Sequence, residues 1–423
     1  MKLQKIISRL QRLHPKEIDL SLDRIQNLCK KLNNPQDKLN CISVVGTNGK
    51  NSTIQAIRAI LTEAKINCNI YTSPHIQKIN ERFIYNNKEI EDKKLANLLL
   101  EVEEINNNEP ITFFEILTAA FFYGARKYSN NITLVETGLF HRFDATNILK
   151  KNLTSIVTAI GLDHLDWLPK KEKTIKKIIF EKTSSLLTSN IVVSKQSSKK
   201  VLNKIKHSIK NNNSKKIIFN NDFNYLINES NFILYEDKFG SLRLPYPNLN
   251  GKFQLDNIST AIATLRNLNL KISNKKIKKG ITKIKNIGRL QEIKNGKLKK
   301  LIKNNKLFID GSHNPLGAKV LAEHIDKLNC KKHIIIGMMS NKDHKNYLKY
   351  FKNKIDSLTT INIPNQKNSI DRHDLKKKLN WKKVKINSKS NIHNAINSIK
   401  IKNDDIIIIT GSLYLVGEIL NLN

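Results

Sequence analysis

The chain has 423 residues, 39% of them hydrophobic, and this length predicts two domains because single cores rarely grow beyond about 250–300 residues. No run approaches the roughly 18 apolar residues of a membrane helix, and the N-terminal stretch lacks the apolar region of a signal peptide. The cysteines show no metal-binding spacing, as expected for structural thiols in a reducing cytoplasm. These features argue against a membrane or secreted protein.

The net charge of +38 raises the question of a nucleic-acid partner. Of the 74 basic residues, only 11 are arginine, the residue that proteins prefer for forked contacts to phosphates and bases. The lysines are dispersed among asparagine and isoleucine, as in KKIKKGITKIKNIG, and form no single stripe with interleaved aromatic residues. We interpret the charge as a compositional bias at exposed positions, and we expect no nucleic-acid partner.

The first chemical signal is the stretch CISVVGTNGKNSTIQAIRAI, residues 41–60. A β-branched run meets a turn from Gly46 to Lys50, and apolar residues at helical spacing follow. Such a turn can hold phosphate, because glycine lets backbone N–H groups curl around an anion and the helix N-terminus adds its positive dipole end. Lys50 would neutralise phosphate oxygens, and Ser52 or Thr53 could place a hydroxyl on Mg²⁺. Only two residues separate the glycines, so an ordinary strand–turn–helix remains the alternative.

Short apolar runs then alternate with helical patterns. Helical patterning covers residues 6–32; strands are predicted at 69–72, 132–136, 155–160 and 191–194, and helices at 95–105, 113–128 and 174–187. This alternation predicts a parallel, doubly wound sheet, whose ligands lie beyond the carboxyl ends of the strands.

The rest of the chain predicts a second α/β unit. Residues 196–235 look less regular, with short β-like pieces such as NFILYED; an apolar helix is predicted at 258–268, and a weaker region follows at 275–288. Further strands are predicted at 307–310, 333–337, 358–363 and 405–410. We place the domain boundary near residues 288–290, which gives domains 1–288 and 289–423.

Polar residues follow several predicted strands. Ser52, Ser73 and Glu136 offer the oxygen ligands that Mg²⁺ prefers around ATP, and His164 could hold a second divalent ion. Singly, each is as well explained by an ordinary loop residue. Their joint placement at one sheet edge favours a site.

The second half carries three more candidates. Asp310, after an apolar strand, suits hydrogen bonding to ribose hydroxyls, and His313 with the following asparagine could face phosphate or substrate. A hydroxyl-rich turn at residues 410–418 opens a helix and suits a carboxylate. Arg289, isolated among lysines, could make a forked phosphate contact.

Together the motifs carry a resemblance. GTNGKNST, YTSPHIQKINERF, TFFEILTAAFF, VETGLFHRFDATN, IGLDHLDWL, FEKTS, GKFQLDNISTAIATL, GRLQE, DGSHNPLGA and TGSLYLVGE occur in order along nearly the whole chain. They resemble the folylpolyglutamate synthase / dihydrofolate synthase family of the Mur ligase superfamily, and IDLSLDRI looks like that family's N-terminal segment in its bifunctional bacterial members. The resemblance implies a Mur-ligase-like α/β fold: a P-loop parallel-sheet ATPase domain that also binds pterin, then a smaller Rossmann-like glutamate-ligase domain.

The resemblance also implies site residues. The ATP contacts would be Asn48, Gly49, Lys50, Asn51, Ser52, Asn257, Arg289 and Asp310, and the Mg²⁺ ligands at two sites would be Ser73, Glu136, His164 and Lys182. Lys182 matches a lysine that the family carries as a carbamate; from sequence alone it is one more helical surface lysine. The pterin segments would be Phe113, Phe114, Glu115, Arg142, Phe143 and Asp144, and the glutamate would meet His313 and Ser412. Lys50, Lys182, His164 and His313 would take part in catalysis.

The sequence departs from the family pattern in two places. Asn51 stands where glycine is usual, and we expect a crowded loop that survives because Asn tolerates left-handed backbone. Phe140 and His141 replace the usual glycine pair and are expected to reshape the pterin pocket.

The implied function is ATP-dependent addition of L-glutamate to dihydropteroate, to (tetrahydro)folate, or to both, through an acyl phosphate. The enzyme would be a cytoplasmic monomer whose partners are these small molecules. Two alternatives remain: a Mur-type ligase with another acid substrate, and a basic P-loop ATPase that binds nucleic acid.

Overall fold

The computed structural model describes residues 3–16, 19–228, 232–268 and 270–423. The chain divides into two compact units. The first comprises Met1–Ile160, Thr174–Asn248 and Leu255–Ile284, and the second comprises Gly161–Lys173, Leu249–Gln254 and Lys285–Asn423. The second unit thus includes two short segments from within residues 1–288, and the simpler division at 288 stays a prediction.

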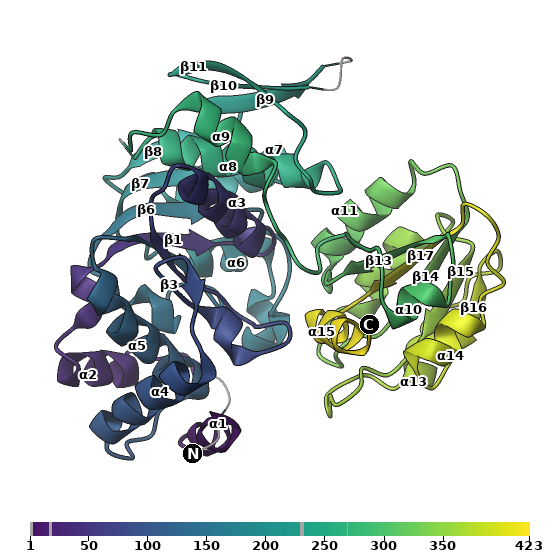
Figure 1. Ribbon diagram of the computed structural model, residues 1–423, viewed down its shortest axis with the longest axis horizontal. Helices are drawn as coiled ribbons and strands as arrows, with labels where there is room; N and C mark the ends of the chain where they lie inside the picture. The colour runs from purple at the N-terminus through teal and green to yellow at the C-terminus, as the bar shows by residue number, and fades with distance from the viewer. Residues whose placement is uncertain (1–2, 17–18, 229–231, 269) are drawn as a thin grey trace. The chain divides into compact units, whose positions relative to one another are not determined.

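The first unit is built on an eight-stranded sheet in the order β4-β3-β2-β5-β1-β6-β7-β8 (Figure 1). Its parallel strands are β1 (Asn40–Val45), β2 (Cys68–Tyr71), β5 (Ile132–Glu136), β6 (Asn152–Val157), β7 (Thr188–Val193) and β8 (Lys215–Ile218), while β3 (Phe83–Tyr85) and β4 (Lys88–Glu89) run antiparallel at one edge. β1 lies between β5 and β6, with Val44 opposite Glu136 and Val45 opposite Val157. Strands later in the chain therefore end beside the turn that follows β1.

Helices cover this sheet. They are α1 (Leu3–Leu10), α2 (Asp23–Lys31), α3 (Lys50–Glu63), α4 (Asp92–Asn106), α5 (Phe113–Ala125), α6 (Ile175–Thr183), α7 (Lys199–Ser208), α8 (Phe253–Arg266) and α9 (Asn274–Ile281). α1 packs on α4, α2 packs on α5, and α3 packs on α9 (Figure 1). The predicted helical patterning at 6–32 is therefore two helices, and the described residues between them are not helical. Residues 17–18, within IDLSLDRI, lie outside the described part.

The expectation for residues 196–235 is confirmed in part: the β-like piece NFILYED contains a strand, but the regular structure around it was not predicted. This region contains α7 and β8, and then β9 (Phe223–Ile227) and β10 (Ile233–Asp237), which form an antiparallel sheet with β11 (Gly240–Leu244). In Figure 1 this small sheet lies at the end of the first unit away from α1 and α2. The prediction failed because α7 buries only Ile205, so lysine dominates its sequence and its apolar face is narrow.

The second unit is a six-stranded sheet in the order β12-β13-β17-β14-β15-β16. β13 (Lys306–Asp310), β17 (Ile406–Thr410), β14 (Lys332–Ile336), β15 (Ser357–Thr360) and β16 (Lys385–Ser388) are parallel, and β12 (Gln291–Ile293) is antiparallel. Six helices accompany them in the described chain: α10 (Lys297–Lys300), α11 (Pro315–Ile325), α12 (His344–Leu348), α13 (Arg372–Lys377), α14 (Ile392–Asn397) and α15 (Leu413–Leu422). The four strands predicted here are present. β12 and β16 were missed because each is short and only partly buried.

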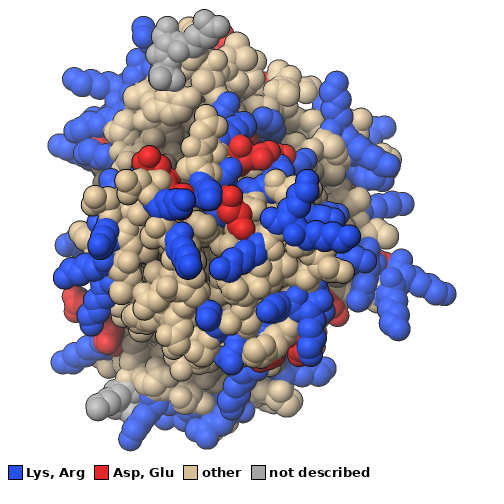
Figure 2. Space-filling view, turned by 90° about the vertical axis from the view of Figure 1, so that its right-hand side faces the viewer, with Lys and Arg blue, Asp and Glu red and all other residues tan. Residues whose placement is uncertain are grey.

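Surface and thiol properties agree with the sequence-based interpretation. Figure 2 shows basic side chains spread over the whole visible face, with acidic side chains among them, and no single basic stripe. The thiols of Cys29, Cys41 and Cys68 are buried and all four cysteines are free. Among the described residues, no helix is long and apolar enough to cross a membrane.

Candidate active site

The turn after β1 is shaped by two glycines. Gly46 has φ +153° and Gly49 has φ +91°, and Gly49 is the residue before the first turn of α3. A Cβ at Gly46 would come within 1.9 Å of Thr158 Oγ1, and one at Gly49 within 2.4 Å of Asn257 Oδ1. The backbone N–H groups of Thr47 and Asn48 both donate to Ala159 O, at 2.9 and 3.1 Å. The loop is therefore fixed by the end of β6, with predicted ATP residue Asn257 against it.

The expected reason for the tolerance of Asn51, a left-handed backbone conformation, is wrong. Asn51 lies in the first turn of α3 with helical backbone, so it needs no left-handed conformation. The residue with a left-handed backbone conformation is Gly49. Asparagine is thus accommodated in the first turn of the helix, where its propensity cost relative to alanine is at most about 0.7 kcal/mol.

Gly49→Ala is expected to destabilise the protein more than Gly240→Ala does. The two glycines have nearly the same φ, +91° and +95°, so each replacement carries the same left-handed backbone cost of about 1–2 kcal/mol. A Cβ at Gly240 meets nothing within 4 Å, whereas one at Gly49 meets Asn257. Urea unfolding measures the difference in stability, and calorimetric titration with ADP should show weaker binding for Gly49→Ala alone. Equal losses in both variants would contradict a crowding effect.

Two lysines converge on one carbonyl at the start of this turn. Lys50 Nζ lies 3.3 Å from Gly46 O, and Lys182 Nζ lies 3.0 Å from the same oxygen. Lys182 is only 3% exposed, so the interpretation of it as a surface lysine is wrong. Two ammonium groups this close repel one another, and an anion beside them or the loss of one charge relieves that repulsion. The arrangement favours phosphate binding here.

The predicted metal residues are placed as follows. Glu136, 5% exposed, ends β5, and its Oε2 accepts from the Ser73 N–H at 3.4 Å. Ser73 follows β2, so these two residues do meet at the carboxyl edge of the sheet. His164 belongs to the second unit, and its part in a metal site stays a prediction. Within the described residues, no group of three or more His, Cys, Asp or Glu side chains is arranged to hold a metal.

Two predicted pterin residues meet at Gly138. A Cβ there would lie 2.9 Å from Phe114 Cζ and 3.1 Å from Asp144 Oδ2, so only glycine lets the ring and the carboxylate approach. Asp144 is buried, and this burial raises its pKa although it accepts hydrogen bonds from the N–H groups of Leu139 and Thr146. An aromatic face beside a buried carboxylate suits a flat, hydrogen-bonding ring.

Two other predicted pterin residues form ion pairs. Both oxygens of the Glu115 carboxylate accept from the Arg24 guanidinium, at 3.0 and 3.1 Å, and Oε2 also accepts from the Thr112 N–H as the helix cap of α5. Arg142 donates to both carboxylate oxygens of Glu181, at 2.8 and 2.9 Å. Its guanidinium lies 4.3 Å from the Phe143 ring centre, and Phe113 is partly buried against the core. Glu115 therefore has a structural partner that sequence reasoning missed.

Phe140 and His141 occupy unusual positions. Phe140 has φ +57° although it is not glycine, a conformation that costs about 1 kcal/mol or more. His141 is 1% exposed, and neither ring nitrogen has a hydrogen-bond partner. Leaving such a group unpaired costs about 1–3 kcal/mol. Burial and the charge of Lys182 lower the pKa of His141 to about 3, so its imidazole is neutral.

In the second unit, predicted nucleotide residues surround the end of β13. Asp310 is 5% exposed and its two oxygens accept from the N–H groups of Leu290 and Ser312, both at 2.9 Å. A Cβ at Gly311 would lie 3.5 Å from Arg289 Nη1, so Arg289 is beside this turn. Ser412 caps α15 by accepting from the Tyr414 N–H at 3.1 Å. Asp310 thus holds the turn, and its predicted ribose contact stays a prediction.

Asp163 is the centre of a polar cluster in the second unit. Its carboxylate accepts from Asn314 Nδ2 and Lys342 Nζ, both at 2.9 Å, and lies 3.5 Å from His313 Nε2. His313 Nδ1 donates to Gly311 O at 2.9 Å, which fixes the ring. Burial alone would raise the pKa of Asp163, but hydrogen bonding from His313 and the charge of Lys342 hold it well below its usual value. His313, predicted to meet glutamate, is therefore oriented by an anion.

Comparison with known proteins decides the family. Residues 292–422 match the family model described as "Dihydrofolate synthetase, C-terminal domain". The chain is 26% identical to the dihydrofolate synthase/folylpolyglutamate synthase of Haemophilus influenzae, over 98% of this chain and 96% of that one, and 28% identical to the Bacillus subtilis protein of that name, over 94% of each. It superposes on E. coli FolC in complex with DHPP and ADP with a TM-score of 0.87 and 25% identity, over 100% of this chain and 97% of that one. The chain is similar along nearly its whole length to the folylpolyglutamate synthase / dihydrofolate synthase family.

This similarity confirms the predicted Mur-ligase-like α/β fold and the predicted enzyme class, an ATP-dependent acid–amino-acid ligase. The individual site residues stay predictions. Sequence reasoning missed Lys342, which lies in the loop after β14 and so meets the strand-end criterion that found the others. It also missed Arg24. Because arginine is rare in this chain, each arginine could have been examined as a candidate for a specific contact.

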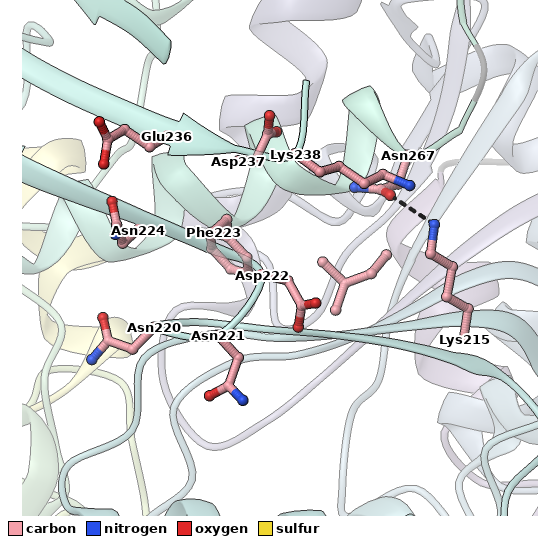
Figure 3. Close-up of a pocket in the computed structure, with 11 residues that line it drawn as sticks. Lys215, Asn220, Asn221, Asp222, Phe223, Asn224, Glu236, Asp237, Lys238 and Asn267 are labelled. Carbon is pink, nitrogen blue, oxygen red and sulfur yellow. Dashed lines mark hydrogen bonds between the residues drawn. The ribbon is translucent and has the colours of Figure 1, made fainter. Parts of the chain in front are cut away.

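This folate synthase homologue also has a pocket of about 370 Å³ that none of the predicted site residues line (Figure 3). It lies among β8, β9, β10 and the residue that follows α8, and Lys215 Nζ donates to Asn267 Oδ1 there at 3.2 Å. The pKa of Lys215 is lowered by its contact with the Lys238 side chain. Acidic residues, including Asp222, line the same pocket, so the pocket favours neither anionic nor cationic ligands.

Asp163→Asn is expected to destabilise the protein by about 3 kcal/mol, because it removes the anion from a buried, hydrogen-bonded charge cluster. The Asp163 side chain is only 7% exposed beside Lys342. The control is Asp166→Asn, an exposed aspartate three residues on that accepts from Asn341 Nδ2 at 3.1 Å. Scanning calorimetry of the full chain should show a lower melting temperature for Asp163→Asn only. Equal melting temperatures would mean that the cluster contributes little.

Proposed function

We propose that this enzyme joins L-glutamate to the carboxylate of dihydropteroate, of (tetrahydro)folate, or of both. The observation that carries the proposal is the convergence of Lys50 and Lys182 on Gly46 O, at the end of the central strand. It is supported by relatives that carry both activities in one name and by a FolC structure that holds ADP. Acyl transfer of this kind needs a site for transferring a phosphoryl group, and Lys50 supplies a positive charge at this turn.

The proposed reaction has two steps. The substrate carboxylate attacks the γ-phosphorus of ATP, so that an oxygen–phosphorus bond forms, the bond to ADP breaks, and an acyl phosphate results. The α-amine of glutamate then attacks the acyl carbon, loses a proton, and displaces inorganic phosphate. Lys50 stabilises charge on the transferring group, and Asn48, Gly49, Asn51, Ser52 and Asn257 with Arg289 and Asp310 position the nucleotide. Positioning and electrostatics therefore supply most of the rate.

Divalent cations belong to this proposal. Mg²⁺ neutralises charge on the phosphates when it is bound. We assign two ions to Ser73, Glu136, His164 and a carbamate on Lys182, a set dominated by the oxygen donors that Mg²⁺ prefers. The carbamate forms when the neutral amine of Lys182 attacks carbon dioxide: a nitrogen–carbon bond forms, one carbon–oxygen π pair moves to oxygen, and the amine releases a proton. Burial of Lys182 against a second ammonium group supports this change from cation to anion.

The remaining residues bind the other substrates. Phe113, Phe114, Glu115, Arg142, Phe143 and Asp144 are assigned to the pterin ring, and Asp144 beside Phe114 is the best-supported pair because both border Gly138. His313, oriented by Asp163, and Ser412 are assigned to glutamate. The enzyme would act in the cytoplasm as a monomer on these small molecules, without nucleic acid.

ADP release tests the proposal. Purified protein is supplied with ATP and Mg²⁺, and with dihydropteroate, tetrahydrofolate and L-glutamate singly and in combination. We expect ADP release only when glutamate and one of the two acids are present together, and the two acids tested apart separate the two synthase activities. Release that ignores all three compounds but responds to DNA or RNA would overturn the proposal. Release with another acid would indicate a different Mur-type ligase.

A further inference from the structure

His141 is the buried histidine of the described chain whose ring nitrogens both lack a hydrogen-bond partner. It is 1% exposed, and both Nδ1 and Nε2 lack a hydrogen-bond partner. The other buried histidines of the described chain have partners: His333 contacts Ser357 Oγ at 2.8 Å, and His344 Nε2 contacts Met339 O at 2.9 Å. A buried donor without a hydrogen-bond acceptor in the protein indicates a partner that the unmodified polypeptide does not supply.

The residues on either side of His141 indicate where this partner would lie. The residue after it is held against α6, because the Arg142 N–H donates to Glu181 O at 3.0 Å. The residue before it, Phe140, has its ring centre 5.7 Å from Lys182 Nζ. Both flanking residues therefore contact the same turn of α6, the turn that carries Lys182. Burial and, as the smaller cause, the charge of Lys182 lower the pKa of the His141 imidazole.

We propose that His141 is a positioning residue that donates a hydrogen bond to the carbamate formed on Lys182. The inference rests on the proposed function, in which Lys182 carries that group. A neutral imidazole always carries one N–H, and a carbamate is an acceptor with two oxygens and a negative charge. Donation from a buried neutral group to an anion is favourable, whereas the unmodified ammonium offers His141 no acceptor.

The strained backbone beside His141 also supports a specific role for this residue. Phe140 keeps a left-handed φ of +57°, which bulky residues rarely adopt, and its ring is 2% exposed. A pair of glycines would take this turn without strain but would bring no donor to Lys182. The structure thus combines an unfavourable backbone with a side chain that gains its partner only when Lys182 is modified.

Carbon-13 NMR of the full chain in ¹³C-bicarbonate tests the inference. The wild type should give a carbamate resonance that Lys182→Ala abolishes. His141→Leu, which keeps the burial and removes the donor, should need roughly 10- to 100-fold more bicarbonate for half occupancy, as expected for loss of a hydrogen bond to a charged group. His141→Gln places an amide N–H near Nε2 and His141→Asn places one near Nδ1, so at least one of them should restore occupancy.

Thermal unfolding gives a second measurement. If His141 only filled space, replacing it would not change the effect of bicarbonate on the melting temperature. Bicarbonate should raise the melting temperature of the wild type, because a ligand bound only by the folded state stabilises it, and should have little effect on His141→Leu. The matched control is Thr359→Val, which removes another buried, unpartnered oxygen in the second unit and should keep the full response. Equal occupancy and equal response in wild type and His141→Leu would overturn the inference. So would the absence of a carbamate in a wild type that still ligates glutamate, an outcome that leaves the proposed ligase activity standing.

Discussion

Lys50→Ala is expected to abolish glutamate ligation while leaving the fold intact. The side chain lies at the first turn of α3, with Nζ 3.3 Å from Gly46 O and 3.5 Å from Thr47 O. Removing a preorganised charge from a phosphoryl-transfer site costs about 3–4 kcal/mol, which corresponds to at least a hundredfold and up to about a thousandfold fall in kcat. The measurement is ADP release with saturating substrates, with circular dichroism to establish that the variant is folded.

The control for Lys50→Ala is Lys93→Ala, which removes an exposed lysine near the start of α4. It lowers the net charge by the same amount, so any general electrostatic attraction of anionic substrates changes equally. Lys93→Ala should retain near-normal turnover. Near-normal turnover in Lys50→Ala as well would remove this turn from the phosphate site, and equal losses in both would point to net charge as the cause.

Lys182→Ala is expected to reduce turnover by a factor of at least about 100 and to be partly rescued by small carboxylates such as acetate. The side chain is 3% exposed and its Nζ contacts Gly46 O, so a methyl group leaves space where an anionic oxygen donor would act. An added carboxylate can supply such oxygens for Mg²⁺. The measurement is ADP release at increasing acetate concentration, with chloride at equal ionic strength as the salt control.

Lys176→Ala is the matched variant, because Lys176 is an exposed lysine on the same helix. It should be fully active and indifferent to acetate. A fully active Lys182→Ala would show that no carbamate is needed. An inactive variant that no carboxylate rescues would assign Lys182 a direct role as a cation.

The sheet and its functional edge were predictable because the strands are apolar on both faces. Buried parallel strands such as residues 132–136 are largely apolar, and polar residues at or after their ends mark the edge where ligands bind. For the same reason Ser73 and Glu136 could be placed near each other before any coordinates. The convergence of Lys50 and Lys182 could not, because helical patterning does not specify which lysine of a basic helix turns inward.

The parts that sequence did not reveal depend on contacts between distant residues. The pair of Arg24 with Glu115 joins residues that are 91 positions apart, and no local pattern records it. The lysine-rich helix α7 was missed because composition outweighed its narrow apolar face. The unpaired state of His141 is likewise a property of its surroundings, since the same residue on a loop would be solvated.

The placement of Asp163 has a consequence for synthesis and for truncation. Residues 161–173 belong to the second unit, where Asp163 accepts from Asn314 and Lys342, although more than a hundred residues of the first unit's sequence follow them. During synthesis this segment leaves the ribosome early, and its contacts with the second unit can form only after residues near 342 have been made. A fragment that begins at residue 289 would lack that partner altogether and leave the Lys342 ammonium group without its carboxylate. The smallest fragment that folds as a complete second unit is therefore not a contiguous piece of the chain.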